Sequence, residues 1–132
     1  MQPAAIENWH RVVKSKDPKG LDDILADDVV FQSPVVHTPQ RGKAITMAYL
    51  TAAMHVLSND DRFRYVGEWF GPDSAILEFE TEIDGIVING IDMIGWNKEG
   101  KIDRFKVMVR PLKAINLLHS LMAERLAAMM KA

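Results

Sequence analysis

The fold is decided by the stretch Gly90-Ile91-Asp92-Met93-Ile94-Gly95-Trp96-Asn97-Lys98-Glu99-Gly100-Lys101-Ile102-Asp103-Arg104-Phe105. It predicts two strands joined by a short turn around Gly100, and one acid, Asp92, stands in the first strand among apolar neighbours. Charged side chains are rarely buried unless they are paired or have a task. We therefore expect Asp92 to face a cavity and the protein to act there.

Alternating residues extend this hairpin into a sheet. Residues 75–83 place apolar side chains on one face and glutamates on the other. Asp84-Gly85 then gives a strong hairpin signal before a strand over 86–96. An earlier strand places three aromatic residues on one face: Phe63, Tyr65 and Trp69. After the turn, the last strand places three apolar residues on one face: Phe105, Val107 and Val109.

Helical spacing of apolar residues predicts helices before and after these strands in the sequence. The first covers residues 4–15, and a second short helix points Leu21, Ile24 and Leu25 inward and stops before Asp27. A brief strand over 29–32 precedes a third helix over 42–57. A last amphipathic helix covers 112–131. This order predicts one α+β domain over residues 1–132, with helices covering one face of a curved antiparallel sheet and the helix 112–131 as an extension.

Composition excludes several classes of function. The 132 residues are 48% hydrophobic and 26% charged with a net charge of −2, which is typical of a soluble globular domain and gives no basic stripe for nucleic acid. The absence of cysteine excludes disulfides and Cys-ligated zinc. The histidines show no metal-binding spacing, so we expect no metal and no cofactor. Neither a membrane-spanning segment nor a signal peptide is visible, and we expect a cytoplasmic protein.

The strand over 86–96 is apolar on both faces, which bears on assembly. Helices can cover only one face of the sheet, so a second subunit or the C-terminal helix has to cover the other. We therefore expect a homodimer that forms through the outer sheet face, the C-terminal helix or both.

Three local segments carry a resemblance to a known family: residues 27–34 (DDVVFQSP), 41–45 (RGKAI) and 91–97 (IDMIGWN). With the order of elements, they resemble the nuclear transport factor 2-like superfamily, and within it the SnoaL-like and ketosteroid isomerase branches. The resemblance implies a cystatin-like α+β cone whose curved sheet encloses a pocket for a small, mostly apolar molecule. Proteins with this fold have many activities, so the resemblance implies a fold more firmly than a function.

The isomerase positions transfer only in part. The isomerases place a general-base aspartate directly before the proline of the Ser33-Pro34 pair, and this chain has Ser33 there. At the position of their oxyanion-hole tyrosine it has Trp9, which can donate a hydrogen bond but cannot act as an acid. Only their oxyanion-hole aspartate is kept, as Asp92. The resemblance thus argues against steroid isomerase activity, while the acid–base aspartate of SnoaL-like polyketide cyclases remains a possible counterpart of Asp92.

Two functions from different classes follow. In the first, Asp92 performs cofactor-free isomerase, cyclase or hydratase chemistry on a small apolar carbonyl compound, with Tyr49 or Ser33 orienting its oxygen and His37 as a second acid–base candidate. In the second, the domain is a non-catalytic ligand-binding or dimeric interaction module, and Asp92 is a structural acid that accepts a hydrogen bond from Trp9 or from a backbone N–H. The pocket expected for either function is lined, besides Asp92, by Trp9, Phe31, Ser33, Tyr49, Leu77, Phe79, Ile94, Trp96, Phe105 and Val107.

Overall fold

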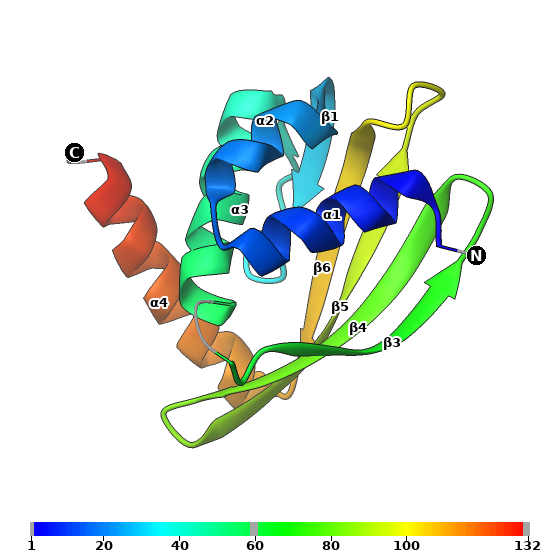
Figure 1. Cartoon of the computed structure of the whole chain (residues 1–132). Helices are drawn as coiled ribbons and strands as arrows, with labels where there is room; N and C mark the ends of the chain where they lie inside the picture. The colour runs from blue at the N-terminus through cyan, green and yellow to red at the C-terminus, as the bar shows by residue number, and fades with distance from the viewer. Residues whose placement is uncertain (1, 59–60, 131–132) are drawn as a thin grey trace.

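The computed structural model describes residues 2–58 and 61–130. In these residues one six-stranded sheet has the order β2-β1-β6-β5-β4-β3. The sheet is strongly curved, and α1, α2 and α3 lie on its concave side (Figure 1). The strands are β1 (Leu25–Gln32), β2 (Gln40–Arg41), β3 (Arg64–Phe70), β4 (Ser74–Ile83), β5 (Ile86–Trp96) and β6 (Ile102–Arg110). The expected α+β architecture is confirmed.

Strand pairing follows the predicted meander from β3 to β6, with Asp92 of β5 opposite Leu77 of β4 and Val107 of β6. One pairing is parallel: β1 runs beside β6, with Phe31 opposite Phe105. A parallel pair needs a long crossover connection, and the helices and strands between β1 and β6 provide it. The sheet is therefore antiparallel except at β1–β6.

The helices are α1 (Ala4–Ser15), α2 (Leu21–Ile24), α3 (Lys43–Leu57) and α4 (Leu112–Met130), with a short 3-10 turn at Pro18–Gly20. The expected end of the last helix, Lys131, lies outside the described residues. The second predicted helix is too long, because Leu25 already pairs with Ile102 of β6. Asp27 and Asp28 accordingly lie inside β1 as exposed residues.

A bulge in β3 changes the expected face of one aromatic residue. The register with β4 shifts between Tyr65 and Gly67, so Tyr65 lies opposite Phe79 while Trp69 lies opposite Ile76 on the outer face. A bulge adds one residue and so reverses the alternation beyond it. Trp69 is 56% exposed as a result, and the prediction that it shares the face of Tyr65 is wrong.

Gly90 allows the sheet to close tightly beside Asp92. A Cβ at this position would lie 2.5 Å from Cζ of Phe79 and 2.7 Å from the carbonyl oxygen of Met108. Only glycine permits the Phe79 ring to lie across the strand here. The Phe79 ring therefore packs on the inner face over Gly90, which lies two residues before Asp92 in β5.

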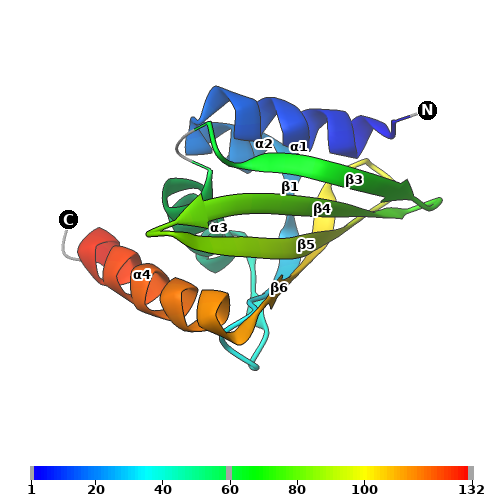
Figure 2. The ribbon, with the colours of Figure 1, turned by 90° about the horizontal axis from the view of Figure 1, so that it is seen from below.

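The C-terminal helix covers the concave side of the sheet and leaves the outer face open. Ala114 and Leu118 of α4 are buried in one cluster with Phe79 and Ile88 of the sheet. Figure 2 shows α4 leaving the end of β6 and running past α3. The helix therefore completes the wall around the space that Asp92 faces.

Candidate active site

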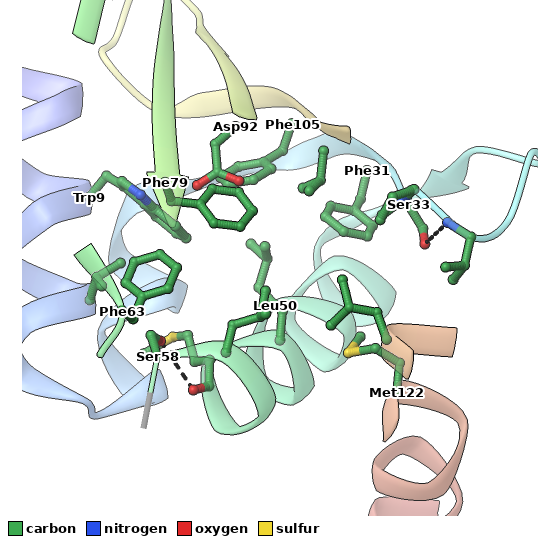
Figure 3. A pocket seen from close by; sticks show the side chains of 18 of the residues that line it. Trp9, Phe31, Ser33, Leu50, Ser58, Phe63, Phe79, Asp92, Phe105 and Met122 are labelled. Atoms are coloured by element: carbon green, nitrogen blue, oxygen red, sulfur yellow. Dashed lines mark hydrogen bonds between the residues drawn. The ribbon is translucent and has the colours of Figure 1, made fainter. Parts of the chain in front are cut away.

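Asp92 lies on the inner face of β5 and is 6% exposed. Its carboxyl group points into a cavity between the sheet and the helices (Figure 3). The neighbours of Asp92 across the two adjacent strands, Leu77 and Val107, carry no charge. Asp92 is thus a buried acid with no charged residue opposite it on either neighbouring strand.

A chain of two hydrogen bonds ends on this carboxyl group. The Tyr65 hydroxyl donates to Oδ2 of Asp92 at 2.6 Å. The indole Nε1 of Trp9 donates to the Tyr65 oxygen at 2.9 Å. Among the described residues no donor contacts Oδ1 of Asp92. One carboxyl oxygen is therefore held by the protein and the other is available to a molecule in the cavity.

Burial sets the acidity of both groups. It raises the pKa of Asp92 from its ordinary value to about 7, and the hydrogen bond from Tyr65 lowers that pKa in part. Burial, followed by the charge of Asp92, raises the pKa of the Tyr65 hydroxyl well above its ordinary value. Asp92 can therefore exchange a proton near neutral pH while Tyr65 keeps its own.

The cavity has a volume of about 60 Å³. One water needs about 10–15 Å³ of such a cavity, so this cavity has space for about four to six waters or for part of a small molecule. Its wall is almost entirely apolar. The lining residues are Trp9, Val13, Phe31, Ser33, Pro34, Val35, Leu50, Ala53, Met54, Leu57, Ser58, Phe63, Tyr65, Phe79, Asp92, Phe105, Val107, Leu118 and Met122.

Two serines supply further polar groups to the wall. Oγ of Ser33 accepts a hydrogen bond from the Val35 backbone N–H at 3.1 Å, which leaves its own proton available. Ser33 lies away from Asp92, beyond Phe31 (Figure 3). The Ser58 hydroxyl donates to the Met54 carbonyl, so its proton is already used. Ser33 is the serine that can bind an oxygen atom of a ligand.

The structure brings together most of the residues that the sequence places in the pocket. Alongside Asp92, the residues on the cavity wall are Trp9, Phe31, Ser33, Phe79, Phe105 and Val107.

The other expected pocket residues lie elsewhere. Leu77 and Ile94 are on the inner face but pack in the solid core nearer to α1 and α2. Tyr49 packs against the far side of Phe31, with ring centroids 5.5 Å apart. Trp96 lies beside Arg104 in a separate hollow. His37 lines a surface groove with Lys106 that borders the cavity at Ser33 and Val107.

Sequence reasoning missed Tyr65 as the partner of Asp92 and placed Trp9 there instead. The signal was present, because Tyr65 is a tyrosine on an inward face. The missing information was the curvature of the sheet, which brings the Tyr65 hydroxyl of β3 across β4 to the carboxyl group of Asp92 on β5. No cluster of three metal-ligating side chains occurs among the described residues. None of the described helices is long and apolar enough to cross a membrane.

Comparison with known proteins agrees with this fold. A family model described as the SnoaL-like domain matches residues 6–105. A crystal structure described as a steroid delta-isomerase from Pseudomonas aeruginosa is 32% identical, with a TM-score of 0.91 and coverage of 98% of this chain and 93% of that chain. No curated protein matches the chain.

Two further structures are similar. An uncharacterised protein with a cystatin-like fold from Silicibacter pomeroyi is 29% identical over 92% of this chain and 84% of that chain, with a TM-score of 0.84. The epoxide hydrolase/cyclase-like enzyme SalBIII of salinomycin pyran ring formation is 16% identical over 82% and 89%, with a TM-score of 0.63. The latter identity shows a shared fold alone.

Proposed function

Because this chain belongs to the SnoaL-like family, we propose that it performs cofactor-free acid–base chemistry on a small apolar carbonyl compound, with Asp92 as the acid–base group. The reaction is of the isomerase or cyclase type. The observation that carries the proposal is the buried carboxyl group of Asp92, whose Oδ1 is open to the cavity and whose pKa burial raises to about 7.

The chemistry needs only one proton carrier. As a carboxylate, Asp92 takes a proton from the carbon next to the carbonyl group, and the electron pair of that C–H bond moves toward the carbonyl oxygen. Asp92 then returns the proton to another carbon of the conjugated system, which isomerises the compound without net gain or loss of atoms. A general base works best when its pKa lies near the working pH. The Ser33 hydroxyl orients the carbonyl oxygen from its side of the cavity.

The shape of the site favours a compound smaller than a steroid. A cavity of about 60 Å³ has no space for a fused four-ring system unless the wall moves. The chain also has Ser33 where the isomerases carry their general base. The similarity to a protein described as a steroid delta-isomerase supports the reaction type, and the wall supports a smaller substrate.

A binding experiment tests the cavity as the site. Cyclohexanone, added to the protein and followed by backbone amide NMR, is expected to shift the signals of residues around Asp92 and Phe79 in a saturable way. Replacement Ala53→Phe fills the cavity from α3 and should weaken binding at least about tenfold, which is the effect of losing roughly 1.4 kcal/mol of contact.

The matched control is His55→Phe, which adds a similar ring to the exposed face of the same helix. It should leave the affinity unchanged. Equal affinity of the wild type and Ala53→Phe would contradict the cavity as the binding site. Binding without turnover of any carbonyl compound would favour a non-catalytic binding module instead.

We also propose that two copies pair through the outer sheet face. An apolar patch, called here the outer patch, crosses β3 to β6 on this face and consists of Trp69, Ile76, Ile91, Met93 and Met108. Trp69 and Met108 are 56% and 50% exposed. No described helix lies over this face (Figures 1 and 2). Contiguous apolar surface of this kind marks interfaces.

The outer patch predicts the oligomeric state. Sedimentation at micromolar concentration is expected to give a dimer for the wild type and a monomer for Met108→Glu, since the introduced charges would face each other in an apolar contact. Ile45→Glu, at a 40% exposed apolar position on α3, should remain dimeric. A monomeric wild type would contradict the outer patch as an interface.

A further inference from the structure

We infer that Trp9 and Tyr65 are positioning residues for Asp92. Trp9 orients the Tyr65 hydroxyl so that it donates its proton to Oδ2, and Asp92 therefore exchanges its own proton through Oδ1 alone. The inference rests on the proposed function, because it assigns the direction of proton exchange at that same site. Its test measures the carboxyl group without any ligand, so the two proposals can fail separately.

Donor and acceptor chemistry fixes the direction of the hydrogen bonds. An indole N–H can only donate, and a tyrosine hydroxyl has one proton to give. Trp9 occupies a lone pair of the Tyr65 oxygen at 2.9 Å, so the hydroxyl proton has to point elsewhere. The acceptor within reach is Oδ2 of Asp92 at 2.6 Å. The order Trp9 to Tyr65 to Asp92 therefore cannot be reversed.

The Tyr65 ring is held so firmly that this direction is maintained. It has three edge-to-face neighbours: the ring of Phe63 at 5.2 Å, just before β3, that of Phe79 at 6.4 Å on β4, and that of His10 at 5.1 Å on α1. The imidazole of His10 is itself held by Glu68 of β3 through Nε2 at 2.5 Å. Rotation of the hydroxyl proton toward the cavity would break the hydrogen bond to Asp92 and leave Oδ2 without a donor.

As a consequence, the two carboxyl oxygens of Asp92 have different roles. When the group is ionised, Oδ2 is stabilised by Tyr65, and Oδ1 is left to receive a proton from a bound molecule. When the group is protonated, a proton on Oδ2 would face the Tyr65 proton, so the acid proton resides on Oδ1 and faces the cavity. Each proton that Asp92 takes or gives thus passes through the oxygen that a substrate can reach.

The same contacts keep the carboxyl group in a useful range of acidity. Burial raises the pKa of Asp92, and the Tyr65 hydrogen bond opposes this rise. The other ionisable groups near the pair are His10 of α1 and Glu68 of β3, which lie behind Tyr65. Leu77 and Val107, on either side of Asp92, do not titrate. Tyr65 is therefore the group that allows Asp92 to ionise near neutral pH.

The test is a titration of the Asp92 side-chain carboxyl carbon by NMR, without ligand, in the wild type, two single variants, their double variant and one control. Tyr65→Phe keeps the ring and removes the hydroxyl, and it should raise the pKa of Asp92 by about one pH unit, the usual effect of losing one charge-assisted hydrogen bond. Replacing Trp9 with benzothienylalanine keeps the shape of the ring system and exchanges the N–H for sulfur. It should raise the pKa by roughly 10–30% of that amount, because the chain of hydrogen bonds is weakened but not removed.

The double variant tests whether Trp9 acts on Asp92 through Tyr65. If Trp9 acts through Tyr65, loss of the indole N–H adds no further rise in a Tyr65→Phe background. Trp69→Phe, an indole replacement on the exposed outer face of the same strand, is the control and should leave the pKa of Asp92 unchanged. A rise from the Trp9 change that is equally large with and without the Tyr65 hydroxyl would overturn the inference, and so would an unchanged pKa in Tyr65→Phe.

Activity separates this inference from the proposed function. The midpoint of the dependence of kcat/KM on pH should move upward in Tyr65→Phe by the same amount as the NMR titration. If no carbonyl compound is turned over but the titrations behave as expected, the positioning role is supported and the proposed reaction fails. If Asp92 is needed for turnover but its pKa ignores Tyr65, the reaction is supported and the positioning role fails.

Discussion

The variant Asp92→Asn is expected to lower kcat/KM for a small β,γ-unsaturated ketone by about 1,000-fold, within the range that a positioned acid–base group contributes. An amide has nearly the same shape as the carboxyl group and can still accept the Tyr65 hydrogen bond, so the fold should be kept. It cannot take up or release the proton that the reaction needs. Conversion of cyclohexenone from its unconjugated to its conjugated isomer, which increases near-ultraviolet absorption, measures the loss.

A matched substitution controls for the change from acid to amide. Asp103→Asn alters a partly exposed acid on β6 that pairs with Arg104 away from the cavity. Its activity should equal that of the wild type. In the wild type kcat/KM should rise with pH to a plateau with its midpoint near 7, because the ionised form of Asp92 is the base. Retention of activity by Asp92→Asn would contradict the assigned role.

The second large effect is a loss of stability with rising pH that comes from Asp92 alone. The unfolded chain releases the Asp92 proton near pH 4, whereas the folded protein keeps it until about pH 7. Between these values folding retains a proton, so each pH unit lowers the free energy of unfolding by about 1.4 kcal/mol. The stabilisation is complete below pH 4 and has been lost above pH 7, a total of about 4 kcal/mol.

Urea unfolding of the wild type and of Asp92→Asn from pH 4.5 to pH 8.5 measures this contribution, since all other groups are shared. Over this range, which begins above the unfolded pKa, the difference in the free energy of unfolding between the two proteins should change by about 3 kcal/mol in favour of the variant as the pH rises. Two curves that stay parallel over this range would show that Asp92 has an ordinary pKa in the folded protein.

The sequence predicts that Asp92 faces the cavity, and the structure places Asp92 on the inner face of β5. The strand is apolar on both faces, so this prediction comes from the lone acid and not from alternation. The sequence does not predict where along that face the cavity begins. Leu77 and Ile94 have the same alternation and the same apolar character as Phe79 and Val107, yet they pack in the solid core. The difference comes from the helices above them, whose positions depend on tertiary packing.

The polar partner of Asp92 shows a second limit. Trp9 was predicted near the carboxyl group and is one hydrogen bond further away, because Tyr65 lies between them. A bulge in β3 decides which of its aromatic residues face inward, and the sequence carries no distinct signal for it. In the same way, the amphipathic pattern of the last helix predicts burial of Leu118 and Met122 but not that they line the cavity.

The most direct test of the central claim is the titration of the Asp92 carboxyl carbon in the wild type, alone and with a saturating small ketone. We predict a midpoint near pH 7 in the free protein. The ketone should raise this midpoint, because it displaces water from the cavity and so makes the charged form of the carboxyl group less favourable. A midpoint near pH 4 that does not respond to the ketone would contradict the claim that Asp92 is the acid–base group of this cavity.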